Sequence, residues 1–270
     1  MRKLVIAAVA AVAVIALSGV AYAVNHYDVH VAKTSPVAKG SAKKPVPIAL
    51  DFGYLVTGDT PQLRATPIKQ YRIGAEGLVT YPKVAKSCKF SEAFSSVISP
   101  KCKKAKVGQG IVINKFGASS DPSALGVCNL KLTLYNLSDA GRLGGLAIRL
   151  DGDPPPPADP DSRDPGCPLA VHQAIKAPYF KTKIDGLPAS ELRFTVPPNL
   201  LHPVGGVDNS VREAVSHVNK IVGKARVKGK MRRVGFYSAV GCKGKNRTTR
   251  VRFVDEQNQL FTANDTDGKC

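Results

Sequence analysis

The sequence contains no tryptophan, only two methionines and five scattered histidines. It also lacks the G-x-S-x-G, H-E-x-x-H and G-x-x-x-x-G-K-[ST] motifs of hydrolases, zinc proteases and P-loop proteins. No two cysteines have the C-x-x-C spacing of zinc and redox sites. These absences predict a protein that is not an enzyme and needs neither a cofactor nor a metal ion. The alternative is a secreted hydrolase whose catalytic residues are brought together from distant parts of the chain.

Acidic residues are missing from one long stretch. The chain has 39 lysines and arginines against 20 acidic residues, a formal net charge of +19, and residues 214–254 hold 12 of the basic side chains with no acid among them. Charge focused in this way attracts anions more strongly than the same charge spread evenly. The stretch therefore predicts an anion-binding surface formed by Lys224, Arg226, Lys228, Lys230, Lys243, Lys245, Arg250 and Arg252.

The spacing of these residues suggests how such a surface would form. Lys224, Arg226, Lys228 and Lys230 fall at every second position, so in one strand they would share a face. Arg250 and Arg252 would project from a second strand, and the two faces would combine if both strands belonged to one sheet. The expected partners are an anionic cell-wall polymer or lipid headgroups, whereas nucleic acid suits an exported protein poorly. A solvated strand face that prevents edge-to-edge aggregation is the alternative.

The first 23 residues have the pattern of a secretory signal peptide. Arg2 and Lys3 precede an unbroken apolar run at 4–17, and Ala21-Tyr22-Ala23 supplies small residues at a cleavage site. We therefore expect a secreted protein, extracellular or associated with the cell wall, with no stable transmembrane span after cleavage. An uncleaved anchor is the alternative, although the apolar run is short for a span.

Six cysteines follow this segment, and an even number in an exported chain predicts disulfides. Six cysteines allow 15 connectivities, and spacing alone does not choose among them. Our hypothesis is the nearest-neighbour pairing Cys88–Cys102, Cys128–Cys167 and Cys242–Cys270.

The pattern of apolar residues predicts a mainly β fold. From Val46 to Val56 every second residue is apolar, and about ten such segments are separated by turn residues drawn from 24 glycines and 20 prolines. One helix is expected near 210–222, because Ser210 and Glu213 form a capping box before an apolar stripe. The expected fold is an antiparallel β-sandwich with that helix packed against it, and an immunoglobulin-like sandwich is one form of this fold.

The expected organisation is a flexible lead-in at 24–44 and a single domain at 45–270. Within the domain, a loop rich in proline and aspartate spans 151–166. Asp151, Asp153 and Asp159 could supply oxygen ligands to calcium, but the spacing fits no EF-hand loop. We interpret this loop as a solvated surface segment without a metal.

Several segments together resemble uncharacterised exported, cysteine-containing all-β proteins of Gram-positive bacteria. The resemblance covers most of the chain after the signal. It implies the same all-β fold but no activity and no site residues. The segments that carry it are Ile48–Tyr54, the run Cys128-Asn-Leu-Lys-Leu-Thr-Leu-Tyr-Asn, Gly166-Cys167-Pro168, the run Phe194-Thr-Val-Pro-Pro-Asn-Leu-Leu-His-Pro, Val240-Gly-Cys242 and the terminal Cys270.

Overall fold

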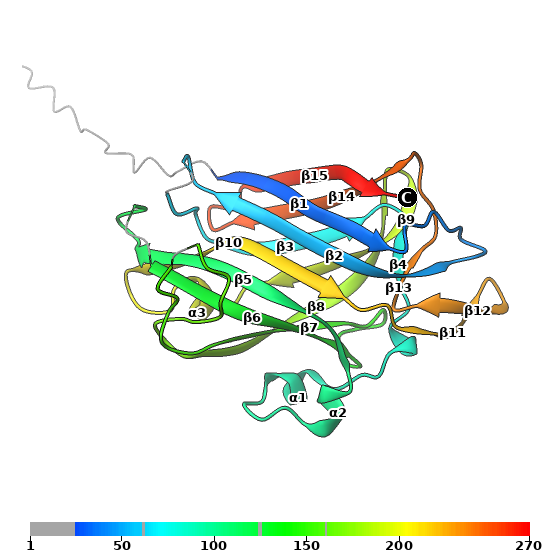
Figure 1. Cartoon of the computed structure of the whole chain (residues 1–270), viewed down its shortest axis with the longest axis horizontal. Helices are drawn as coiled ribbons and strands as arrows, with labels where there is room; N and C mark the ends of the chain where they lie inside the picture. Colours follow the sequence, from blue (N-terminus) through cyan, green and yellow to red (C-terminus); the bar gives the residue numbers. More distant parts are fainter. Residues whose placement is uncertain (1–24, 61–62, 124–125, 160) are drawn as a thin grey trace, which may run out of the picture.

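The computed structural model describes residues 25–60, 63–123, 126–159 and 161–270, so the predicted signal peptide lies outside the described residues (Figure 1). Strands make up most of this part of the chain. They are β1 (His26–Ser35), β2 (Val46–Thr57), β3 (Ile68–Ala75), β4 (Leu78–Thr80), β5 (Lys106–Ala118), β6 (Gly126–Leu137), β7 (Gly145–Gly152), β8 (Val171–Ile184), β9 (Leu187–Thr195), β10 (Val207–Val218), β11 (Val222–Val227), β12 (Lys230–Gly235), β13 (Tyr237–Ala239), β14 (Asn246–Asp255) and β15 (Leu260–Lys269). The helices are short: a 3₁₀ turn (Pro82–Val84), α1 (Phe90–Phe94), α2 (Pro100–Lys103) and α3 (Pro198–Leu201).

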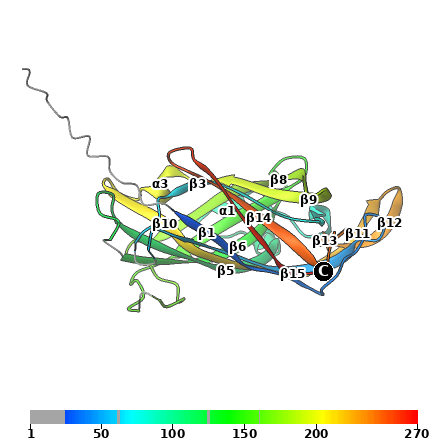
Figure 2. The same ribbon diagram turned by 90° about the horizontal axis from the view of Figure 1, so that it is seen from above.

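Within the described residues, thirteen strands form one antiparallel sheet. Its order is β15-β14-β3-β9-β8-β7-β6-β5-β10-β2-β13-β4, with β1 paired to β2. The sheet curls until β1 lies beside β15, and Figure 2 shows β8 and β9 on one side of the core with β1 and β5 on the other. The mainly antiparallel β prediction is confirmed, whereas the immunoglobulin-like variant is not, because the strands follow one hydrogen-bonded path.

The alternation of inward-facing and outward-facing residues along the strands explains which side chains form the core. In β2, Leu50, Phe52 and Tyr54 all turn toward the interior, as the sequence pattern predicts. Tyr54 packs against Tyr71 of β3 and Phe253 of β14, with ring centroids 5.5 Å away in both contacts. Burial raises the pKa of both tyrosines well above the ordinary range, so both stay neutral. The core is thus built by strands that are distant in the sequence.

The helix predicted at 210–222 is wrong, because residues 207–218 form β10. A β-bulge between Val211 and Glu213 adds Arg212 to the strand, so Val211 and Ala214 both face the interior although they are three residues apart. That spacing imitates a helix. The strand forms instead because β10 pairs with β5 on one side and β2 on the other, and its valines suit a pleated surface.

Residues 25–44, the described part of the predicted flexible lead-in, differ from that prediction because they contain β1. The strand pairs with β2 over most of its length, from His26 opposite Thr57 to Ser35 opposite Ala49. Tyr27 stacks between Phe253 and Phe261 at centroid distances of 4.6 and 4.7 Å. This segment therefore belongs to the folded domain.

All three predicted disulfides are confirmed: Cys88–Cys102, Cys128–Cys167 and Cys242–Cys270. Three such bonds are typical of proteins that mature in an oxidising compartment. In the described ranges, no helix combines the length and apolar character needed to cross a membrane.

Candidate anion-binding face

The basic segment after β10 forms a separate two-stranded ribbon, β11–β12, which projects from the large sheet (Figure 1). Lys224 and Arg226 share one face of it. Lys228 instead occupies the hairpin turn with a φ of 46°, and Lys230 lies opposite Val227 on the other face. The prediction that all four residues share one strand face is wrong, because the chain reverses direction at 228–229.

The other predicted residues lie elsewhere. Lys243 and Lys245 are exposed in the loop between β13 and β14, while Arg250 and Arg252 lie on the outer face of β14. Since β14 belongs to the large sheet and the ribbon forms its own sheet, the condition for one combined basic surface is not met. Arg247, from the same basic stretch, is buried and donates hydrogen bonds to carbonyl oxygens of Glu76, Gly241 and Ala38.

Three arginines instead converge on the outer face of the large sheet. Arg252 of β14 lies directly opposite Arg72 of β3, which lies directly opposite Arg193 of β9. We call this set the arginine row. Neighbouring strands are about 4.8 Å apart, so three positive charges follow one line across the sheet. Within the described part of the chain, neither Arg72 nor Arg252 has a hydrogen-bond or ion-pair partner.

Arg193 is held in place at the end of the row. Its Nε donates a hydrogen bond to Glu191 Oε2 at 2.5 Å, and its guanidinium lies 4.4 Å from the ring centroid of Phe180. The side chain of Glu191 is only 8% exposed, which makes it a firm anchor. A fixed guanidinium loses less conformational entropy when it binds an anion than a mobile one does.

A groove runs beside Arg72 and Arg193 on the same outer face. It is a hollow of about 800 Å³, open to solvent and lined by basic and aromatic side chains. Lys176 lies 5.9 Å from the ring centroid of Phe90, while Phe94 and Phe180 are 49% and 40% exposed. We call this hollow the outer groove; its lining includes Gln70, Arg72, Phe90, Phe94, Gln173, Lys176, Phe180, Arg193, Thr195 and Asn199.

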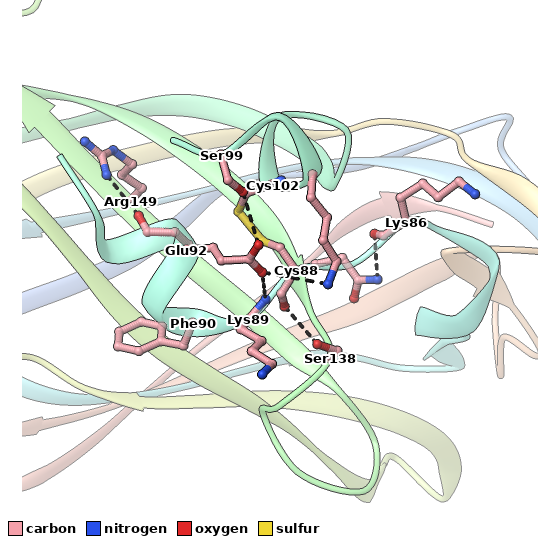
Figure 3. Close-up of a disulfide and its surroundings, with 12 residues drawn as sticks. Lys86, Cys88, Lys89, Phe90, Glu92, Ser99, Cys102, Ser138 and Arg149 are labelled. Atoms are coloured by element: carbon pink, nitrogen blue, oxygen red, sulfur yellow. Dashed lines mark hydrogen bonds and ion pairs between the residues drawn. A yellow bond between two sulfur atoms is a disulfide. The ribbon is translucent and has the colours of Figure 1, made fainter. Parts of the chain in front are cut away.

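The aromatic wall of the outer groove comes from a small lobe that carries α1 and α2. Figure 3 shows the Cys88–Cys102 disulfide, which ties the two ends of this lobe together. The buried Arg149 of β7 donates from Nη1 to the carbonyl oxygens of Ala93 and Ser95, at 2.9 and 2.6 Å. Phe90 and Phe94 therefore project from a lobe that is held in a fixed position.

Side-chain hydrogen bonds also stabilise the N-termini of α1 and α2 in the lobe. The side chain of Glu92 accepts a hydrogen bond from the Lys89 backbone N–H at 2.7 Å, and this lowers the pKa of the carboxyl group. Ser99 Oγ accepts from the Cys102 backbone N–H at 3.1 Å, which caps α2. The lobe thus has a defined position relative to β7 and β8.

The side chains of this face can recognise anions and apolar groups. Guanidinium groups in a row match phosphate, sulfate or carboxylate oxygens, and exposed phenyl rings match apolar faces of sugars or acyl groups. Several histidines do pair with carboxylates, such as His172 with Asp151 at 3.1 Å and His217 with Asp51 at 2.6 Å. These pairs are on the surface, and the described residues that line the outer groove include no histidine.

Sequence reasoning identified Arg252 but missed Arg72 and Arg193. A signal for them existed, since each arginine stands between two apolar strand residues, as in Tyr71-Arg72-Ile73 and Leu192-Arg193-Phe194. That pattern predicts an outward-facing arginine, but not that three such strands lie side by side.

In the described part of the acidic loop, Asp151 and Asp153 make contacts with basic side chains. Asp151 and Asp153 both contact His172, and Asp151 also pairs with Arg149. Over the described ranges, no group of three or more histidine, cysteine or acidic side chains is arranged to hold a metal ion.

Comparison of the chain with protein-family models, with curated proteins and with solved structures found no match. The resemblance to exported all-β proteins of Gram-positive bacteria therefore stays a prediction. The arginine row and the outer groove are the features that bear on function.

Proposed function

We propose that this protein is an exported or wall-associated, non-enzymatic binding protein for an anionic envelope polymer, which it holds through the arginine row and the outer groove. The observation that carries the proposal is the direct alignment of Arg252, Arg72 and Arg193 on adjacent strands. Like charges placed directly opposite each other destabilise a sheet, by roughly 0.2–1 kcal/mol per pair. A bound anion removes this repulsion, so the row is better suited to the complex than to the free protein.

The dimensions favour a repeating anion over a single small one. Three adjacent strands place the outer two arginines roughly 10 Å apart, so successive phosphate groups of a polymer can each meet a guanidinium. Beyond Arg193 the outer groove continues the path with Lys176 and the rings of Phe90 and Phe180. An extended polymer therefore gains polar contacts along the row and apolar contacts in the groove.

Binding to immobilised long-chain polyphosphate under graded salt tests the proposal. Arg72→Gln with Arg252→Gln should weaken retention roughly hundredfold at low salt, because two charged hydrogen-bond donors are lost at about 1.5 kcal/mol each. The matched control is Lys224→Gln with Arg226→Gln, which removes the same charge from the β11–β12 ribbon. This control should stay within a few fold of the wild type.

Equal loss in both double variants would mean that net charge alone causes retention, and the proposal would fail. Anionic lipid vesicles provide the second arm of the experiment. Retention on vesicles without retention on polyphosphate would identify a headgroup surface and would also contradict a polymer ligand. Thermal unfolding of each variant verifies that the fold is intact, as expected for charged side chains that reach solvent.

A further inference from the structure

The curled sheet encloses a second hollow, on the side of the strands opposite the arginine row. It has a volume of about 140 Å³. Its lining is almost entirely aliphatic and aromatic and includes no charged side chain, as in the stretch made by Leu130, Leu132, Ile148, Leu150 and Ile175. An apolar protein cavity of about 150 Å³ is known to accept benzene. The size and lining thus suit a small, neutral organic molecule.

Asn114 is one of a few polar side chains in this lining, together with Asn209, Ser190, Ser216 and Thr249. It lies on β5 opposite Val211, the residue is 2% exposed, and its buried Oδ1 has no hydrogen-bond partner among the described residues. The large majority of buried side-chain polar atoms in proteins do have a partner. A buried amide oxygen without a partner indicates that its hydrogen-bond donor comes from a molecule outside the chain.

A second amide lies at the same end of the cavity. Asn209 of β10 also lines it, and its Nδ2 donates to the carbonyl oxygen of Leu200 at 2.7 Å, which holds α3 against the sheet. Its buried Oδ1 has no partner in the described part of the chain. Leu200 and Leu201 of α3 complete the lining here. Two amide oxygens that lack donors therefore lie at the end that α3 covers.

We propose that this cavity binds a small neutral amphiphile, with an apolar ring or short chain among the leucines and a hydroxyl group hydrogen-bonded to Asn114. A hydroxyl supplies the missing donor and can also accept from the amide nitrogen. A carboxylate or ammonium head is excluded, because the lining offers no charge to compensate its burial. This site is separate from the outer groove, so its ligand and the polymer do not compete.

Benzyl alcohol and toluene are matched probes, since they differ by one hydroxyl group. Titration calorimetry should show that the wild-type protein binds both and that Asn114→Leu lowers the ratio of benzyl alcohol affinity to toluene affinity about tenfold, the equivalent of one neutral hydrogen bond. Toluene affinity itself should persist in this variant. Arg72→Gln is the control on the opposite face and should leave both affinities unchanged.

Filling the cavity gives an independent readout. Val211→Phe should abolish binding of both probes, and Ala214→Leu serves the same purpose if the larger substitution prevents folding. Failure of the wild type to bind either probe would overturn the proposal, as would an affinity ratio that Asn114→Leu leaves unchanged. A crystal structure from benzyl alcohol-soaked crystals with only water at Asn114 would also overturn it. None of these results depends on whether the outer groove binds a polymer.

Discussion

The two faces of β3, β9 and β14 differ completely in chemistry although they belong to the same strands. The outer face carries Arg72, Arg193 and Arg252, while the neighbouring residues Tyr71, Leu192, Phe194, Ile73, Val251 and Phe253 turn to the interior. A two-residue period makes both surfaces at once. The same three strands therefore build two sites of opposite polarity. Each site can be tested by substitutions that leave the other intact.

The β11–β12 ribbon sharpens the contrast with the outer face. It has the higher density of basic residues in the sequence, yet its charges are divided between two faces and a turn. The outer face has fewer charges, which three separate strands bring into one row. Charge density along the chain is therefore a poor guide to where charges converge.

The largest effect is expected from removing the disulfide that supports the outer groove. Cys88→Ser with Cys102→Ser should lower the free energy of unfolding by about 3 kcal/mol, the value for a loop of this length. Polyphosphate retention should fall because Phe90 and Phe94 lose their fixed position, while benzyl alcohol affinity stays the same. Denaturant unfolding and the two binding assays measure this.

The matched control for that prediction is Cys242→Ser with Cys270→Ser, which opens a loop that lines no part of the outer groove, although Thr249 of this loop lines the inner cavity. It should lower stability to a similar extent and leave polyphosphate retention unchanged under folding conditions. An equal loss of retention in both double variants would show that the lobe makes no specific contribution.

On the inner face, Asn114→Leu should stabilise the protein without ligand. Replacing a buried amide that lacks a partner by an apolar side chain of similar size should raise the free energy of unfolding by about 1–3 kcal/mol. Asn136→Leu is the contrasting variant, because Asn136 Nδ2 donates to the carbonyl oxygens of Pro82 and Lys86 and its loss should destabilise. Chemical denaturation distinguishes the two, and destabilisation by Asn114→Leu would contradict our interpretation of the cavity.

A smaller effect is expected from relieving repulsion on the outer face. Arg72→Thr should raise the free energy of unfolding by about 0.2–1 kcal/mol at low salt, and the gain should shrink as salt screens the charges. Arg250→Thr should give no gain, because Arg250 pairs with Asp185 at 3.1 Å and with Asn264 at 2.9 Å. Thermal unfolding at two salt concentrations compares them. If both variants gained equally, strand propensity and not the arginine row would be the cause.

The smallest effect concerns pH and the element that covers the inner face. His202 follows α3, and its hydrogen bond to Glu256, at 2.5 Å, raises the pKa of the imidazole, with a further contribution from Asp208. Because the folded-state pKa is the higher one, this stabilisation is fully present below about pH 6.5 and is lost as the pH rises through the folded value.

The contribution of His202 to stability can be measured by comparing the free energy of unfolding at pH 6 and pH 8. The wild type should lose slightly more stability over this interval than His202→Gln does, and the NMR titration of the ring should lie above that of an unfolded peptide. Polyphosphate retention by the opposite face should have the same pH dependence in both proteins. Identical pH profiles of stability would show that the interaction with Glu256 does not stabilise the fold.

The sequence by itself determined the alternating strand β2, while the nearest-neighbour pairing of the six cysteines was a hypothesis that the structure confirmed. Alternation is a local property, and each disulfide joins cysteines that are neighbours in the cysteine order. Local patterns are readable because they involve few residues and one simple geometry.

Only the tertiary structure decided that 207–218 is a strand and that Arg72, Arg193 and Arg252 form one row. A single bulge at Arg212 was enough to give a strand the apolar spacing of a helix, and pairing on both sides settled its conformation. The row depends on the register between strands that are more than 50 residues apart, and the cavity depends on how far the sheet curls. Register and curvature are set by all the strands together, so no single segment of the sequence contains them.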